Sequence, residues 1–152
     1  MRGCLKNNKD RLRMVIDWLH INNIAILALQ ETHLMEDAIT DLNNKYKHLR
    51  FLGSRLSTAS GGILFIVSNK AGDPLNIQFE VFNKGRTGML SLEYGHQELN
   101  IVNVYLPNNQ IQQRELLESL RNDLGRHQNL TSTELFNMGD WNFVEDKADR
   151  SP

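Results

Sequence analysis

The sequence predicts a domain of the α/β class, and three observations lead to this prediction. Two short apolar runs, at 24–29 and 63–67, are typical of strands buried on both faces. Apolar residues recur at helical spacing near the amino end and again at 112–124. In the middle of the chain, stretches that alternate apolar and polar residues indicate an antiparallel sheet.

The first third of the chain should alternate helices and strands. A helix begins near Asn8 or Asp10, either of which can cap it, and Trp18 broadens its apolar face. The elements expected after this helix are a strand at 24–29, a helix over 36–46 and a strand at 49–52.

The remaining elements begin after the turn Ser60-Gly61-Gly62. No helix follows these glycines directly, so they mark a turn or close packing rather than a phosphate loop. The elements expected from here are strands at 63–67, 75–82, 89–94 and 99–105, a helix at 112–124 and a strand at 133–138.

The composition limits the class of protein. A chain of 152 residues, 40% hydrophobic and 23% charged, is long enough for one folded domain with a core. The formal net charge of −1 gives no overall positive field, so any contact with nucleic acid must come from local arginines and lysines. A single cysteine, Cys4, excludes an intrachain disulfide and a CxxC metal site. We find no signal peptide and no apolar run of about 20 residues, so we expect an intracellular protein without a membrane span.

Polar side chains gather where three predicted strands end. Because open α/β sheets bind ligands at the carboxyl ends of their strands, we expect these side chains in one cleft. A phosphodiesterase needs a carboxylate for a hard cation such as Mg²⁺, and Glu31 fits that role. It also needs a group to position the attacking water and donors for the phosphate oxygens, which Asp140, Asn142 and Tyr105 supply. This inventory predicts metal-assisted hydrolysis.

The same residues have ordinary structural interpretations. Gly139 permits a sharp turn, and Gly-Asp and Asn are common in turns of no function. Glu31 can cap a helix or lie solvated in a loop, and Tyr105 can be a strand aromatic bonded to backbone. His33, a lone histidine beside a carboxylate, does not make a zinc site.

Four motifs occur in a definite order along the chain: LQETHL at 29–34, SGG at 60–62, NVYLPN at 103–108 and GDWN at 139–142. Their order and spacing resemble the endonuclease/exonuclease/phosphatase family, the DNase I-like proteins. The chain looks most similar to the apurinic-type endonuclease domain of LINE-type, non-LTR retrotransposons, where an Asp-Arg pair follows, here Asp149-Arg150. The resemblance implies a four-layer α/β sandwich of two mixed sheets.

The resemblance also implies roles for individual residues. Glu31 would be the metal ligand, for Mg²⁺ or alternatively Mn²⁺, and Asp140 with Asn142 would orient the attacking water. Tyr105, Asn108 and Asn142 would contact phosphate. Asp149 would lie next to these residues without touching the substrate. The implied partner is DNA, and the implied compartment is the nucleus.

Departures from the family lead us to expect that residues 1–152 form a single partial domain. Family members begin with a strand that carries an asparagine ligand and end in a Ser-Asp-His motif, and we find neither. The sequence therefore predicts the amino-terminal portion of a Mg²⁺-dependent phosphodiester hydrolase. The alternative is a catalytically inactive remnant, at most a weak metal- or nucleic-acid-binding fold. In either case, we expect the chain alone to bind Mg²⁺ weakly and to show no measurable DNA nicking.

Overall fold

The computed structural model describes residues 9–57, 61–69, 76–94, 96–127 and 134–142. Within these ranges the helices and strands follow one another in the order that the sequence predicts. None of the helices in the described ranges is long and apolar enough to cross a membrane. The elements are α1 (Lys9–Ile21), β1 (Ile26–Gln30), α2 (Glu36–Lys45), β2 (Leu49–Ser54), β3 (Ile63–Ser68), β4 (Asn76–Asn83), β5 (Thr87–Tyr94), β6 (Gln97–Tyr105), α3 (Gln110–Arg126) and β7 (Glu134–Asp140).

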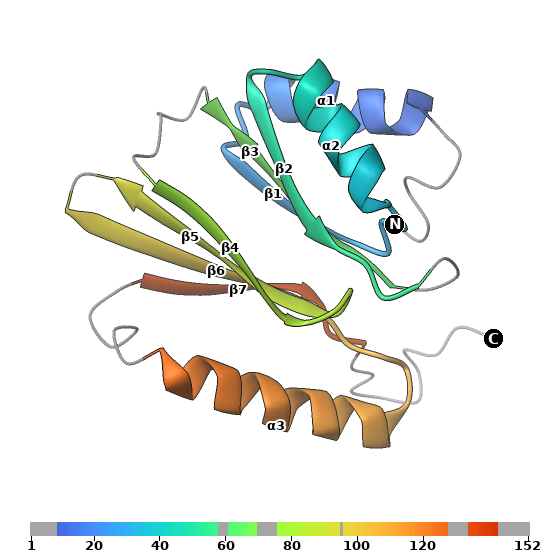
Figure 1. Ribbon diagram of the computed structural model, residues 1–152, viewed down its shortest axis with the longest axis vertical. Helices are drawn as coiled ribbons and strands as arrows, with labels where there is room; N and C mark the ends of the chain where they lie inside the picture. Colours follow the sequence, from blue (N-terminus) through green and yellow to red (C-terminus); the bar gives the residue numbers. More distant parts are fainter. Residues whose placement is uncertain (1–8, 58–60, 70–75, 95, 128–133, 143–152) are drawn as a thin grey trace.

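Two sheets pack face to face, and helices cover both outer faces (Figure 1). α1 and α2 lie on the outer face of the first sheet, whose strand order is β1-β3-β2. α3 lies on the outer face of the second sheet, whose order is β4-β5-β6-β7. These layers confirm the predicted α/β sandwich.

Strand directions follow from the connections between the strands. The first sheet is antiparallel among its described strands, and β4, β5 and β6 are antiparallel neighbours in the second. β7 comes after α3, and a helical crossover returns the chain in its original direction, so β7 runs parallel to β6. This register places Asp140 opposite Tyr105 and brings the carboxyl ends of both strands to one edge of the sheet.

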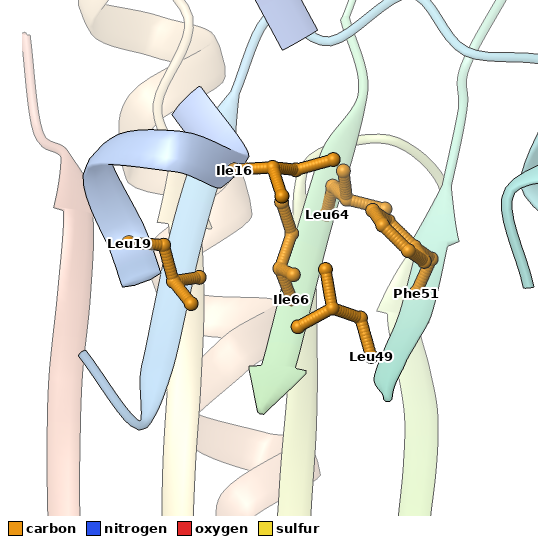
Figure 2. Close-up of a cluster of buried hydrophobic side chains, with 6 residues drawn as sticks. All are labelled: Ile16, Leu19, Leu49, Phe51, Leu64 and Ile66. Carbon is orange, nitrogen blue, oxygen red and sulfur yellow. The ribbon is translucent and has the colours of Figure 1, made fainter. Parts of the chain in front are cut away.

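Three apolar clusters hold the layers together. In the first, Ile16 and Leu19 of α1 pack against Phe51 and Leu64 of the strands beneath (Figure 2). The second cluster fills the space between the sheets, and the third lies under α3. Burial of one such side chain is worth about 1.5–3 kcal/mol relative to exposure, so packing fixes the layers.

Two sequence predictions about burial are wrong. The run 24–29 predicts a strand buried on both faces, but every residue of β1 is only half-buried. The reason is that, among the described strands, β1 has a neighbour on one side only. Trp18 does not broaden the apolar face of α1, because it is 51% exposed. It adjoins Leu19 and lies two positions from Ile16, and such neighbours do not share a helix face.

Candidate active site

Glu31 follows β1 directly, as its sequence position predicts. Its φ of 53° is left-handed, as are those of His33 (52°) and Asn142 (46°), and this conformation costs most residues about 1–2 kcal/mol. The turn that carries Glu31 is held against the residue before β3, because the N–H of Thr32 donates to the Gly62 carbonyl at 3.3 Å. A Cβ on Gly62 would lie 2.8 Å from the Thr32 hydroxyl oxygen. Glycine therefore lets β3 begin close enough to support the turn that presents Glu31.

Tyr105 ends β6, and its hydroxyl donates a hydrogen bond to Oε1 of Glu31. Burial raises the pKa of Tyr105, and the hydrogen bond and negative charge of Glu31 raise it further, while the positive charge of Arg86 acts in the opposite direction. The phenol therefore keeps its proton at neutral pH and acts as a donor. The structure thus joins two predicted site residues that lie 74 positions apart in the sequence.

Arg86 is a candidate functional residue that the sequence analysis missed. Its guanidinium carbon lies 4.5 Å from the centroid of the Tyr105 ring, and its carbonyl accepts the Tyr105 N–H at 2.8 Å. Its Nη1 is buried and has no hydrogen-bond partner within the described part of the chain. A donor of this kind beside a carboxylate and a phenol is suited to an anion. The local signal, a cation in a turn before a strand, is that of any surface arginine.

Asp140 is the last residue of β7 and lies opposite Tyr105. Its Oδ1 accepts the Asn142 N–H at 3.0 Å, and the Asn142 amide nitrogen donates to the carbonyl of the residue after β6. The turn expected at Gly139 is wrong, because β7 continues through this residue to Asp140. Glycine is required there for close approach, because a Cβ would lie 1.9 Å from the Val104 carbonyl oxygen. The end of β7 is therefore fixed tightly against β6.

An amide pair joins the two sheets beside these residues. The Gln30 amide nitrogen donates to Oδ1 of Asn103 at 2.7 Å, and the Asn103 amide nitrogen donates to the Leu29 carbonyl at 3.1 Å. Asn103 is fully buried, where an unpaired amide would cost about 1–3 kcal/mol. Both residues belong to the sequence motifs, but the sequence did not indicate that they hold Glu31 beside Tyr105.

Gln113 connects the same region to the helical layer. Its buried amide nitrogen donates to the carbonyls of Pro107, at 2.8 Å, and Asn142, at 3.3 Å. Asn109 caps α3 by accepting two N–H groups of the first turn. The start of α3 is therefore fixed against the turn that follows β7.

One predicted residue that the structure describes does not join this network, and another cannot be placed. Asn108 is exposed between β6 and α3, and no hydrogen bond among the described residues links it to the Glu31–Tyr105 pair. Asp149 lies outside the described residues. His33 is a half-buried loop residue, and no partner for its Nδ1 is found in the described ranges.

The donor set suits a hydrated cation rather than a closed metal site. No group of three His, Cys, Asp or Glu side chains able to hold a metal occurs in the part of the chain that the structure describes. Glu31 offers one carboxylate, which Tyr105 orients. Mg²⁺ often keeps several waters and binds through one or two carboxylates and phosphate oxygens, so the residues present fit this cation.

A hollow of about 410 Å³ lies at the opposite end of the second sheet. Its lining includes Glu80, Glu93 and Glu98, and His127 lies 3.2 Å from Glu80. Glu98 precedes Tyr105 on β6 by a distance of roughly 20 Å, at about 3.3 Å per residue. The carboxylates that line this hollow disfavour the binding of phosphate. The volume of a hollow alone therefore does not identify the active site.

No protein-family model matches the chain. Solved structures with a similar fold include D. rerio TDP2 complexed with a single strand DNA product, with a TM-score of 0.62 and 18% identity over 92% of this chain and 56% of that chain. An AP endonuclease from Archaeoglobus fulgidus matches with a TM-score of 0.59 and 19% identity, over 93% and 56%. An endonuclease/exonuclease/phosphatase family protein from Bacteroides thetaiotaomicron matches with a TM-score of 0.60 and 12% identity, over 95% and 62%.

These similarities establish the fold. The chain has the DNase I-like fold of endonuclease/exonuclease/phosphatase proteins. It spans only 56% to 62% of the length of these three solved structures.

Proposed function

We propose that the chain is the amino-terminal portion of a Mg²⁺-dependent phosphodiester hydrolase that cleaves DNA, of the retrotransposon endonuclease type. The observation that carries this proposal is the meeting of Glu31, Tyr105 and Asp140, from three strands, at one edge of the sandwich. Ordinary turn residues have no reason to converge in this way. The retrotransposon type rests on the sequence motifs, and the DNA substrate is supported by the AP endonuclease and the DNA-bound TDP2 among the similar structures.

Each residue has a defined part in the proposed reaction. Glu31 holds the cation, Mg²⁺ or Mn²⁺, which when bound stabilises negative charge on the phosphate. Asp140, held by the Asn142 N–H, accepts a proton from a water molecule. The oxygen of that water forms the new bond to phosphorus. The bond from phosphorus to the leaving oxygen breaks, and that oxygen takes a proton from solvent water. Arg86 donates to a phosphate oxygen. Tyr105 keeps the Glu31 carboxylate oriented.

The alternative is a catalytically inactive remnant. The left-handed backbone of Glu31 disfavours this reading, because such strain persists only where the surrounding structure imposes it and is concentrated at functional sites. The hydrogen bonds around Asn103 and Gln113 impose order on the same region.

Metal binding tests the role of Glu31 without requiring activity. Binding of Mn²⁺ to the purified chain, followed by electron paramagnetic resonance, should weaken about tenfold in Glu31→Gln, the equivalent of about 1.4 kcal/mol. Glu118→Gln, which removes an exposed carboxylate of α3, is the matched control and should bind as the parent does. Equal binding by all three proteins would remove Glu31 from the site.

Nicking of supercoiled plasmid tests the reaction. We expect cleavage with Mg²⁺ from a version lengthened at both ends with family segments, and none from the 152-residue chain alone. Asp140→Ala should lower the rate of the lengthened version by about 100-fold or more. An inactive lengthened version would contradict the hydrolase. Nicking by the chain alone that Asp140→Ala abolishes would show that the 152 residues suffice.

A further inference from the structure

A second hollow adjoins the candidate active site and has no part in the mechanism above. Its volume is about 330 Å³, and it lies between the β4–β5 turn, Leu56 and the first half of α3. The lining residues that matter here are Leu56, Asn83, Arg86, Pro107, Gln112 and Glu115.

The hollow connects to the active site on two sides. Arg86 lines it and also stacks on Tyr105, which is bonded to Glu31. Pro107 also lines it, and the Pro107 carbonyl shares the amide nitrogen of Gln113 with the carbonyl of Asn142. A group bound in the hollow would therefore adjoin a phosphate held at Arg86.

The walls suit a flat and uncharged group. Leu56, which lines the hollow and is 47% exposed, offers apolar surface for the face of a ring. The side-chain amides of Asn83 and Gln112 offer donors and acceptors for its edge. The carboxylate of Glu115 disfavours a second phosphate within the hollow. A nucleobase has this chemistry.

The volume points to a single nucleoside. Sites for small molecules commonly measure about 300–1,000 Å³, and this hollow lies at the lower end of that range. A base that is paired and stacked in a duplex cannot enter a pocket unless it leaves the stack, at a cost of a few kcal/mol. The hollow therefore favours a strand whose base is already unpaired.

We infer that this hollow is a subsite for the nucleoside adjoining the scissile phosphate of an unpaired DNA strand. The inference rests on the proposed function and adds a preference for where the strand is cut. Arg86, which lines the hollow, holds the phosphate, and the base lies against Leu56 with its edge towards Gln112.

Binding of two small probes tests this subsite. Deoxyadenosine monophosphate carries a base, whereas deoxyribose 5-phosphate does not, and nuclear magnetic resonance titration of the purified chain gives both affinities. Leu56→Ser and Gln112→Ala should each weaken the nucleotide about tenfold, or about 1.4 kcal/mol, and leave the sugar phosphate unchanged. Ile111→Ser and Gln110→Ala, at exposed positions of α3 outside the lining, are matched controls and should change neither affinity. Arg86→Gln should weaken both probes.

The result that overturns the inference is equal affinity for the two probes, or nucleotide binding that Leu56→Ser and Gln112→Ala leave unchanged. Its failure is distinguishable from that of the proposed function. Base-dependent binding, without Mn²⁺ binding at Glu31 and without nicking by the lengthened version, would support the nucleoside site and remove the hydrolase. Nicking without base-dependent binding would remove the subsite alone.

Discussion

The outer edges of β2 and β7 differ in whether a side chain forms hydrogen bonds with the backbone groups that no strand pairs. At β2, Asn43 of α2 donates to the Phe51 carbonyl and accepts the Phe51 N–H, both at 2.9 Å. These two bonds occupy positions that another strand would use. At β7, no side chain among the described residues bonds to the backbone in this way, and Phe136 and Met138 are 48% and 39% exposed.

The difference defines two sides of the sandwich, and we call the β2 edge, which Asn43 covers, the closed side and the β7 edge the open side. β1, the other edge strand of the first sheet as described, lies over β6 and β7, so the edges of β1 and β7 lie on the same side (Figure 1). Glu31 and Asp140 follow or end these two strands. Exposed apolar side chains beside free strand edges are typical of surfaces that associate.

The largest effect should come from removing β7 from the open side. In Gly139→Ala, the new Cβ would meet the Val104 carbonyl oxygen at 1.9 Å, so β7 must shift away from β6. We expect a loss of about 3 kcal/mol in the free energy of unfolding, measured by urea denaturation. Gly125→Ala, whose Cβ meets nothing within 4 Å, should instead stabilise α3 by about 0.5–1 kcal/mol. Equal stability of the two variants would show that β7 pairs loosely.

A smaller effect should come from opening the closed side. Asn43→Ala removes both bonds to Phe51, and at about 1 kcal/mol for each bond the free energy of unfolding should fall by about 2 kcal/mol. Asn44→Ala is the neighbouring exposed control and should change it by less than about 0.5 kcal/mol. If both variants unfold at the same urea concentration, the side chain does not protect the β2 edge.

A third change makes the open side polar. Phe136→Ser with Met138→Ser should reduce hydrophobic-dye binding and self-association, measured by sedimentation, while the free energy of unfolding changes by about 1 kcal/mol or less. Val81→Ser, at a residue of β4 that is 40% exposed, should leave association unchanged. A similar reduction from Val81→Ser would mean that the two sides do not differ.

The smallest effect concerns the ionisation of the Tyr105 hydroxyl, which lies beside the open side. Burial raises the pKa of the Tyr105 phenol above its ordinary value, and the hydrogen bond and charge of Glu31 raise it further. The folded chain then holds this proton more tightly than the unfolded chain. The resulting stability is present below the unfolded pKa of about 10 and is lost as pH rises through the folded value. Absorbance at alkaline pH should show a tyrosine that ionises late and is missing in Tyr105→Phe, and a titration without that late step would contradict this.

The sequence predicted the elements, and the positions of candidate residues at the ends of strands, because those signals are local. Periodicity marks a strand, and the polar residue after its last apolar position marks its end, as with Glu31 after the run 24–29 and Asp140 after Phe136. We expected these strand ends to lie together because α/β sheets tend to bind ligands at the carboxyl ends of their strands.

Features that depend on how the layers stack were not predictable. The stacking of Arg86 on Tyr105 and the bond from Gln30 to Asn103 join distant segments, and no local pattern marks either. The half-burial of β1 depends on which strands are neighbours, which its apolar composition does not reveal.

The buried Asn103 determines how heat disturbs the molecule. Apolar contact is non-directional, so it sets the separation of the packed sheets more strictly than their relative orientation. The hydrogen bonds of Asn103 are directional and lie at one end of the interface, so thermal sliding becomes a small rotation about that end. Displacement is then smallest where Glu31 meets Tyr105 and largest near Glu98 at the start of β6. Warming should therefore loosen the far end of the sandwich first and the candidate active site last.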